Sequence, residues 1–178
     1  LSYSQAAAVA QPRVLLRSDG TAVAFGRYGS GRCQLPPLVG NLFYTQAAAG
    51  GAHSVLLVGD GTAVACGLNC FGQCDLPGLA VGLTYTQVAA ACSHSVLLRS
   101  DGTAVACGSN GFWQCSLPAL GRGLVYTQVA AGSGHTALLK SDGTAVACGW
   151  HRIAACGIPA VVGSRPSRRV RARCVRSD

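Results

Sequence analysis

Three histidines in the sequence are each followed directly by a hydroxyl residue, and an aspartate lies seven positions after each histidine. The pairs are His53-Ser54, His94-Ser95 and His135-Thr136. Serine, histidine and aspartate together can perform nucleophilic catalysis, but a triad needs one converging site. Because the same pair recurs at equal spacing, we interpret these residues as structural. We expect each histidine to bond backbone groups near its turn and each aspartate to shape a hairpin.

The ten cysteines raise the question of disulfide bonds. Cys66, Cys107 and Cys148 each precede a second cysteine by eight residues. Phe25 lies 41 residues before Cys66 and so occupies the equivalent position at the same spacing. A position that accepts phenylalanine in place of cysteine needs apolar volume. Buried cysteine behaves as a small hydrophobe. We therefore expect reduced thiols, with a disulfide framework as the alternative.

Other patterns that would carry chemistry are incomplete. Cys66, Cys70 and Cys74 lie four residues apart, but the second ligand cluster of a structural zinc site is missing. No glycine-rich turn has the lysine and following helix of a phosphate-binding loop. Four of the six acidic residues lie in Asp-Gly turns and Asp178 is terminal, so no carboxylate pair is available for acid–base work. We expect no metal, no cofactor and no catalytic centre.

A repeat of 41 residues must position all of these side chains. The Asp-Gly dipeptide recurs at Asp19, Asp60, Asp101 and Asp142. The same step superposes the Thr-Ala-Val-Ala, Tyr-Thr-Gln and Leu-Pro segments without an insertion. We therefore predict a module of four units over residues 1–163.

Each unit is typical of β structure. In the third unit, Tyr85–Ala90, Ser95–Arg99 and Thr103–Cys107 predict three short strands. Asp101-Gly102 predicts a two-residue type I′ hairpin turn, and Leu117-Pro118 marks a loop. No segment has the length and period of a helix. We predict an all-β fold, a β-propeller-type repeat array of four units, with a β-solenoid or a β-sandwich as alternatives. The four units either close alone, pair with a second chain or leave an open arc, which is an incomplete propeller.

The unit resembles the repeat of the regulator of chromosome condensation family. The resemblance is carried by His94–Asn110, by Val129–Gly143 and by the ending Gly67–Gln73 of the second unit. It covers about residues 1–160 and implies a β-propeller, which in the family usually has seven blades. The shortened unit is similar to the three-stranded blades of the bacterial β-lactamase inhibitor protein II. The first unit departs from the pattern, because Pro12 stands where later units have histidine.

The loops of the units carry aromatic residues. Loops at one end of a repeat array commonly form its binding face, and aromatic side chains are frequent hot spots of interfaces. We expect a partner protein to bind at Phe71, Phe112, Trp113 and Trp150. The alternative is that these side chains pack against the loop of the next unit.

Residues 164–178 break the repeat and form a basic tail. The tail carries five of the eight net positive charges of the chain, through Arg165, Arg168, Arg169, Arg171, Arg173 and Arg176. We interpret the tail as a solvated, disordered end. Weak contact with nucleic acid and a nuclear-import signal are the alternatives.

With 49% apolar and 11% charged residues, the chain as a whole has the composition of a folded protein. We predict a non-catalytic protein–protein interaction module. The resemblance implies two other functions, a guanine-nucleotide exchange factor for a small GTPase and a segment of a HECT-type ubiquitin ligase. Apolar runs such as Val55–Val58 are far shorter than the roughly 20 residues of a membrane helix, so we expect no membrane span and a cytoplasmic or nuclear location. An open arc exposes apolar blade faces, so we also expect self-association.

Overall fold

The computed structural model describes residues 2–8, 13–25 and 34–150. Within these ranges it contains β-strands and no helix. Three consecutive strands of each unit form one antiparallel sheet, which we call a blade. Blades 1 and 2 contain β1 (Tyr3–Ala8), β2 (Arg13–Arg17), β3 (Ala22–Phe25), β4 (Tyr44–Ala49), β5 (His53–Val58) and β6 (Ala63–Gly67). Blades 3 and 4 contain β7 (Tyr85–Ala90), β8 (His94–Arg99), β9 (Ala104–Gly108), β10 (Tyr126–Gly132), β11 (His135–Lys140) and β12 (Ala145–Gly149). None of the described residues forms a helix that could cross a membrane.

The middle strands of the two interior blades are the most buried elements of the fold. All six residues of β5 are buried, as are the first five of β8. These two strands are apolar on both faces because blades 2 and 3 are each covered by a neighbour on both sides. The predicted strands of the third unit are confirmed to within one residue at each end.

The turn between the second and third strands differs from the prediction. In blade 3 the Gly102 amide donates to the Arg99 carbonyl at 3.0 Å, and the Arg99 amide donates to the Thr103 carbonyl at 2.8 Å. The loop therefore has three residues and places Gly102 at a φ of 78°. A type I′ turn was the wrong expectation, since Asp101 does not take the positive φ it requires. Instead, the Asp101 Oδ1 accepts both the amide and the hydroxyl of Thr103.

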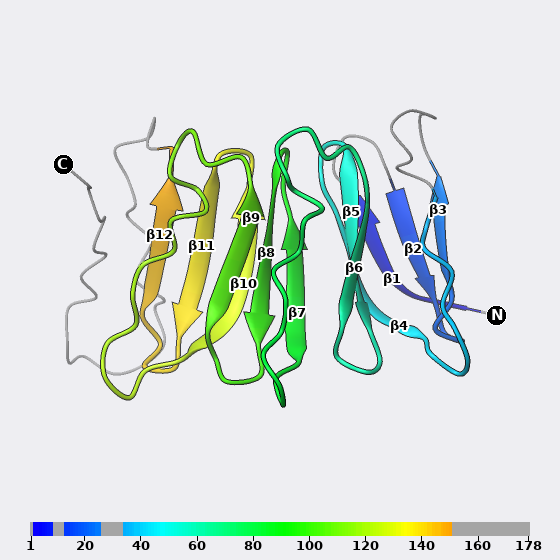
Figure 1. The fold of residues 1–178 in the computed structure, drawn as a ribbon, viewed down its shortest axis with the longest axis horizontal. Helices are drawn as coiled ribbons and strands as arrows, with labels where there is room; N and C mark the ends of the chain where they lie inside the picture. The colour runs from blue at the N-terminus through cyan, green and yellow to red at the C-terminus, as the bar shows by residue number, and fades with distance from the viewer. Residues whose placement is uncertain (1, 9–12, 26–33, 151–178) are drawn as a thin grey trace.

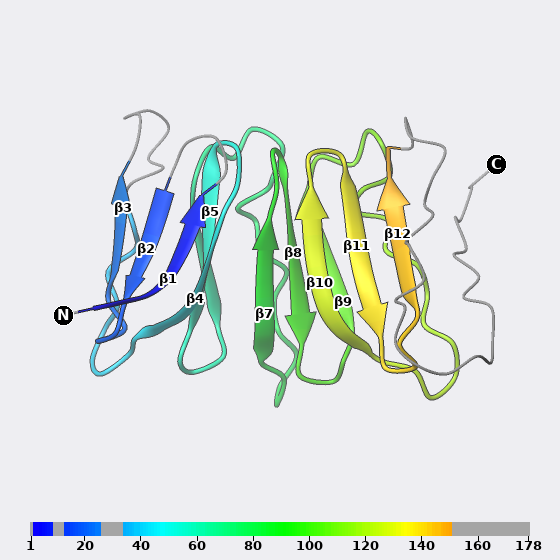
Figure 2. The same cartoon turned by 180° about the vertical axis from the view of Figure 1, so that it is seen from behind.

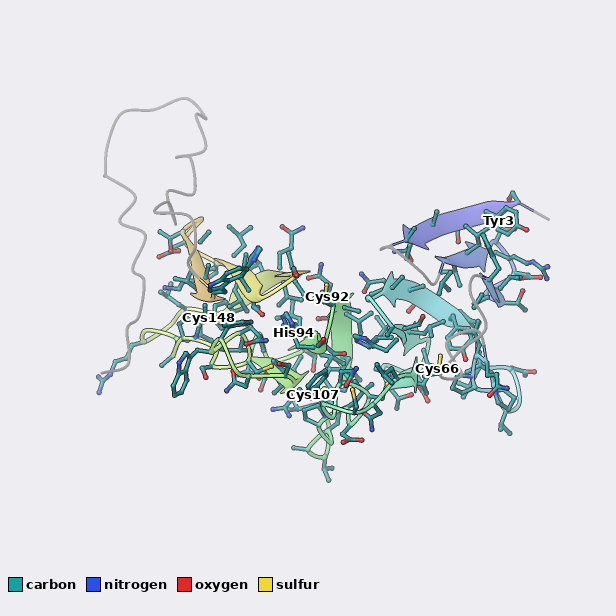
Figure 3. The ribbon with its side chains drawn as sticks, turned by 90° about the horizontal axis from the view of Figure 1, so that it is seen from above. Tyr3, Cys66, Cys92, His94, Cys107 and Cys148 are labelled. Atoms are coloured by element: carbon teal, nitrogen blue, oxygen red, sulfur yellow. The ribbon has the colours of Figure 1, made fainter. Side chains whose placement is uncertain are left out.

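The four blades stack face to face along an arc (Figure 1). The first strands of successive blades, β1, β4, β7 and β10, contact one another and line the concave side, which faces the viewer in Figure 2. Figure 3 shows Tyr3 at one end of this arc, His94 in its middle and Cys148 toward the other end. The prediction of an all-β, propeller-type array is confirmed, and the described sheets form no closed ring, which corresponds to the alternative of an incomplete propeller.

The hydrophobic core is divided into three clusters, one at each junction between blades. At the junction of blades 2 and 3, Val55 and Leu57 of β5 pack with Tyr85 and Val88 of β7. Equivalent residues form the clusters of the other two junctions. Burial of apolar area contributes about 25 cal/mol per Å², so the junctions are the main source of stability.

Candidate functional site

In each of blades 1, 2 and 3, a glutamine on the first strand bonds to the next blade. The Gln5 side chain accepts from the Ala47 amide at 2.8 Å and donates to the Ala47 carbonyl at 3.1 Å. Gln46 accepts from the Val88 amide at 2.9 Å. Gln87 accepts from the amide of Val129 at the same distance. These bonds join the first strands of neighbouring blades along the concave side.

His53 and His94 also cross the junctions, which corrects the expectation that these two side chains bond backbone near their own turn. The His53 Nε2 lies 2.9 Å from the Ser95 Oγ of the next blade, and Ser95 donates its hydroxyl proton to the Gln73 carbonyl at 2.7 Å. Because that proton is already used, His53 must be the donor through Nε2–H. His94 and Thr136 repeat the contact at 3.0 Å.

The two buried histidines are therefore held in the neutral form. The Nδ1 atoms of His53 and His94 are buried and have no hydrogen-bond partner. Burial, together with the next histidine along the arc, lowers the pKa of each to about 4. Protonation of either ring would place an uncompensated charge inside a junction.

The triad components do not converge on one site. The Ser95 and Thr136 hydroxyls are buried and donate to backbone carbonyls. Asp101 lies in an exposed hairpin turn, where hydrogen bonds from Thr103 lower the pKa of its carboxyl. The β8–β9 hairpin and the β7–β8 connection, where His94 begins β8, lie at opposite ends of the blade (Figure 1). The arrangement joins blades and offers no nucleophile.

The cysteines of the third strands make polar contacts that the sequence did not indicate. The Cys107 Sγ donates to the Gln73 carbonyl at 3.6 Å, and the Cys148 Sγ donates to the Gln114 carbonyl at 3.4 Å. Burial raises the pKa of both thiols to about 11. The position therefore does more than fill apolar volume. Reduced thiols throughout the chain remain a prediction, and among the described residues no three metal-ligating side chains are grouped for an ion.

The predicted binding aromatics lie in two loops and at the end of β12. Phe71, Phe112, Trp113 and Trp150 are all 50–60% exposed. The Phe112 and Trp150 rings stack with centroids 5.3 Å apart and planes 21° from parallel, so they join the loop of blade 3 to blade 4. The alternative interpretation, packing against the next unit, therefore holds for Phe112, which still exposes half its surface, and partner binding there stays a prediction. The structure does not bring Phe71 into this stack.

Buried glutamines fix the two loops. The Gln73 Oε1 accepts from the Phe71 amide and the Gln114 Oε1 accepts from the Phe112 amide, both at 2.9 Å. Gln73 is completely buried and Gln114 is 2% exposed. A rigid loop presents its aromatic side chains at little cost in conformational entropy.

Trp113 has a backbone conformation that sequence reasoning missed. Its φ is 65°, and it is the only non-glycine residue with a positive φ in the ranges that the structure describes. The equivalent residue of blade 2 is Gly72, with a φ of 76°. Strain of this kind costs about 1–3 kcal/mol and is concentrated at functional sites. The alignment of Trp113 with Gly72 at the 41-residue step was the available signal.

The concave side holds an open groove of about 590 Å³. Leu57, Leu98 and the repeated Thr-Gln pairs line it, namely Thr45, Gln46, Thr86, Gln87, Thr127 and Gln128. The groove is polar and carries no ionisable side chain among these lining residues. It offers hydrogen-bonding groups but no acid, base or nucleophile. The arginine-rich tail, for which the sequence left nucleic-acid contact as an alternative to a solvated end, lies outside the described residues.

Comparison with known proteins agrees with this geometry. The family model of the regulator of chromosome condensation (RCC1) repeat matches residues 44–73 and 126–152. No curated protein matches the sequence.

Several solved structures share the fold. Yeast RCC1 (Prp20), in a crystal structure with bound Kap60, matches with a TM-score of 0.69 and 21% identity over 83% of this chain and 43% of that chain. Human WBSCR16 matches with a TM-score of 0.67 and 19% identity over 78% and 45% of the two chains. The ectodomain of the receptor kinase CR4 from Physcomitrella patens has a TM-score of 0.65 and 18% identity over 85% and 42%.

The chain spans less than half the length of each of these structures. Two of its four units match the repeat model, and all four share one strand order and one turn. Blades 2 and 4 therefore carry the repeat of the regulator of chromosome condensation type, and blades 1 and 3 share their strand order and turn.

Proposed function

We propose that this chain is a non-catalytic protein–protein interaction module that binds a partner through the aromatic loop surface formed by Phe112, Trp113 and Trp150. The observation that carries the proposal is the Phe112–Trp150 stack, which stays half exposed although it joins two blades. Large, rigid aromatic groups of this kind dominate binding energy at protein interfaces. The adjacent Trp113 keeps a strained backbone where the preceding unit has glycine, which favours a role in binding over a role in folding.

The chemistry of the buried side chains supports a non-catalytic role. The hydroxyls of Ser95 and Thr136 are committed to backbone carbonyls. The raised pKa of Cys107 and of Cys148 leaves little thiolate near neutral pH, and the thiolate is the reactive form of cysteine. These groups support the blades and are poor candidates for catalysis.

The experiment measures binding of the full chain to immobilised probe proteins. Structures of the yeast relative were described with Kap60 and with binding properties toward Gsp1p and histones, so an importin-type adaptor, a Gsp1-type GTPase and histones are suitable probes. Phe112→Ala and Trp150→Ala should each weaken binding about tenfold or more. Val81→Ala is the control, because Val81 is fully exposed in a different loop. Equal affinity of all three variants and the parent chain would refute the proposed surface.

A second candidate function is guanine-nucleotide exchange on a small GTPase. It is favoured by the similarity in fold to yeast RCC1 (Prp20), whose binding to Gsp1p has been described. The chain should then accelerate release of a fluorescent guanine nucleotide from a Gsp1-type GTPase. An unchanged release rate at saturating chain would exclude exchange activity and leave the interaction module standing. The ubiquitin-ligase alternative, a cytoplasmic or nuclear location and a role for the tail remain predictions.

A further inference from the structure

Each interior junction joins two different blade faces. The trailing face of a blade supplies the glutamine of its first strand and two apolar residues of its middle strand, such as Gln46, Val55 and Leu57 in blade 2. The leading face of the following blade supplies a tyrosine and a backbone amide of its first strand, such as Tyr85 and Val88 in blade 3. The same pairing occurs at all three junctions.

The trailing face of blade 4 has these groups, but no blade formed by the described residues receives them. Gln128 is exposed, whereas Gln46 and Gln87 are half-buried and bonded across a junction. Leu139 is half-buried, whereas its counterparts Leu57 and Leu98 are 7% and 6% exposed. Nothing in the described part of the chain bonds the Gln128 side chain.

The leading face of blade 1 is the matching half. Tyr3 is 59% exposed, whereas Tyr44, Tyr85 and Tyr126 are only 4–5% exposed at their junctions. Ala6 is also exposed, although the equivalent Ala47 is buried and bonded to Gln5 through both backbone groups. Leu15 and Val23 of this face are half-buried.

We propose that two copies of this chain join end to end, with the trailing face of blade 4 in each copy seated on the leading face of blade 1 in the other. Gln128 then bonds the backbone of Ala6 of the second copy, as Gln5 bonds Ala47 within one copy. Leu139 packs on Tyr3 of the second copy, as Leu98 packs with Tyr126 at an interior junction. A contact between two unlike faces closes a ring when its rotation completes a circle. Eight blades lie within the range of about four to eight that propellers adopt.

One position distinguishes this contact from the interior junctions. The residue that aligns with Ser54 and Ser95 in blade 1 is Arg13, so the histidine–hydroxyl bond has no counterpart for the exposed His135. Association therefore depends on the glutamine and on the apolar residues. It is separate from the aromatic loop surface, and either proposal can fail without the other.

Sedimentation velocity of the full chain tests the proposal. The parent chain should sediment as a particle of twice 18.0 kDa. Tyr3→Glu on the leading face and Gln128→Glu on the trailing face should each weaken the dimer about tenfold or more, because both junctions then contain one altered face. Thr86→Glu is the matched control, since it adds the same charge on the concave side of blade 3. Melting curves of all variants check that the fold is retained.

An equal mixture of the two variants gives the decisive result. A mixed pair contains one junction whose two faces are both unaltered, so the mixture should dimerise about tenfold more tightly than either variant alone. A parent chain that stays monomeric at about 100 µM, well above typical dissociation constants, would overturn the proposal. A mixture no tighter than the separate variants would overturn it as well, because that result indicates contact between like faces.

Discussion

The junction between blades 1 and 2 and the junction between blades 2 and 3 have the same shape but different polar contacts. At the second, Ser95 accepts from His53 and donates to the Gln73 carbonyl. At the first, the equivalent Ser54 is completely buried and its hydroxyl has no partner among the residues that the structure describes. The histidine position that would serve Ser54 is occupied by Pro12 in the sequence. The glutamine bond is present at both junctions.

This difference separates the contacts that every blade junction needs from the contact that only some junctions have. Apolar packing and the glutamine bond are common to all three junctions, so they are sufficient to stack the blades. The histidine–hydroxyl bond is an addition that two junctions have. An addition of this kind makes those two junctions sensitive to pH and to loss of a single hydroxyl.

The largest expected effect is loss of stability in acid. The unfolded chain has histidine pKa values near 6.5, and the folded values of His53 and His94 are about 4. The stabilising contribution of neutral histidine is therefore complete above pH 6.5 and is lost as the pH falls toward 4. Two such groups cost about 6 kcal/mol over this interval, at about 1.4 kcal/mol per pKa unit. Chemical denaturation at a series of pH values measures the effect.

Hydrogen exchange locates the acid-sensitive regions. At pH 5, β7 and β10 should lose protection before β4, because the junction of blades 1 and 2 has no buried histidine. The double variant His53→Gln and His94→Gln should have a much flatter dependence of stability on pH. A parent chain whose stability is constant from pH 7 to pH 4.5 would contradict this account.

A smaller effect is expected from removing one hydroxyl at each of two junctions. Ser95→Ala should lower the free energy of unfolding by about 2 kcal/mol, because it leaves the His53 donor and the Gln73 carbonyl unpaired in a buried site. Ser54→Ala should be neutral or slightly stabilising, because its buried hydroxyl bonds no group in the described part of the chain. Urea denaturation of the two variants side by side gives the comparison. If both variants lose the same free energy of unfolding, the histidine–hydroxyl bond between blades does not contribute to stability.

The smallest expected effect concerns the loops of blades 2 and 3. Trp113→Gly should raise the free energy of unfolding by about 1 kcal/mol, because glycine takes a positive φ without a steric cost. Gly72→Ala should lower it by a similar amount, because Gly72 has the same backbone conformation. Thermal melts of both variants are sufficient. If Trp113→Gly destabilises the chain instead, the indole supports the loop by packing.

The strands and their grouping were predictable because the 41-residue step repeats every boundary signal. Strand boundaries read in one unit therefore apply to the other three. The observed strands Tyr85–Ala90 and His94–Arg99 agree closely with the expected runs. The exposed loop aromatics were predictable for the same reason, since Phe71 and Phe112 follow the same strand ending.

Contacts between blades were not predictable from one unit. His53 and Ser95 are 42 residues apart, so their pairing follows only from how one sheet lies on the next. The turn type was missed because the Asp101 carboxylate bonds Thr103 and favours a three-residue loop over the type I′ geometry that Asp-Gly usually indicates. The concave groove likewise exists only once β4, β7 and β10 are side by side.

The glutamines of the first strands have a consequence for how such arrays change in length. Each glutamine side chain bonds a backbone group of the next blade, and a backbone group is present whatever the side chain there is. The bond therefore places little demand on the sequence of the neighbouring unit. Duplication or deletion of a stretch of 41 residues therefore creates a new junction with the same glutamine–backbone hydrogen bond. Arrays of this type can thus gain or lose members while every surviving contact keeps its form.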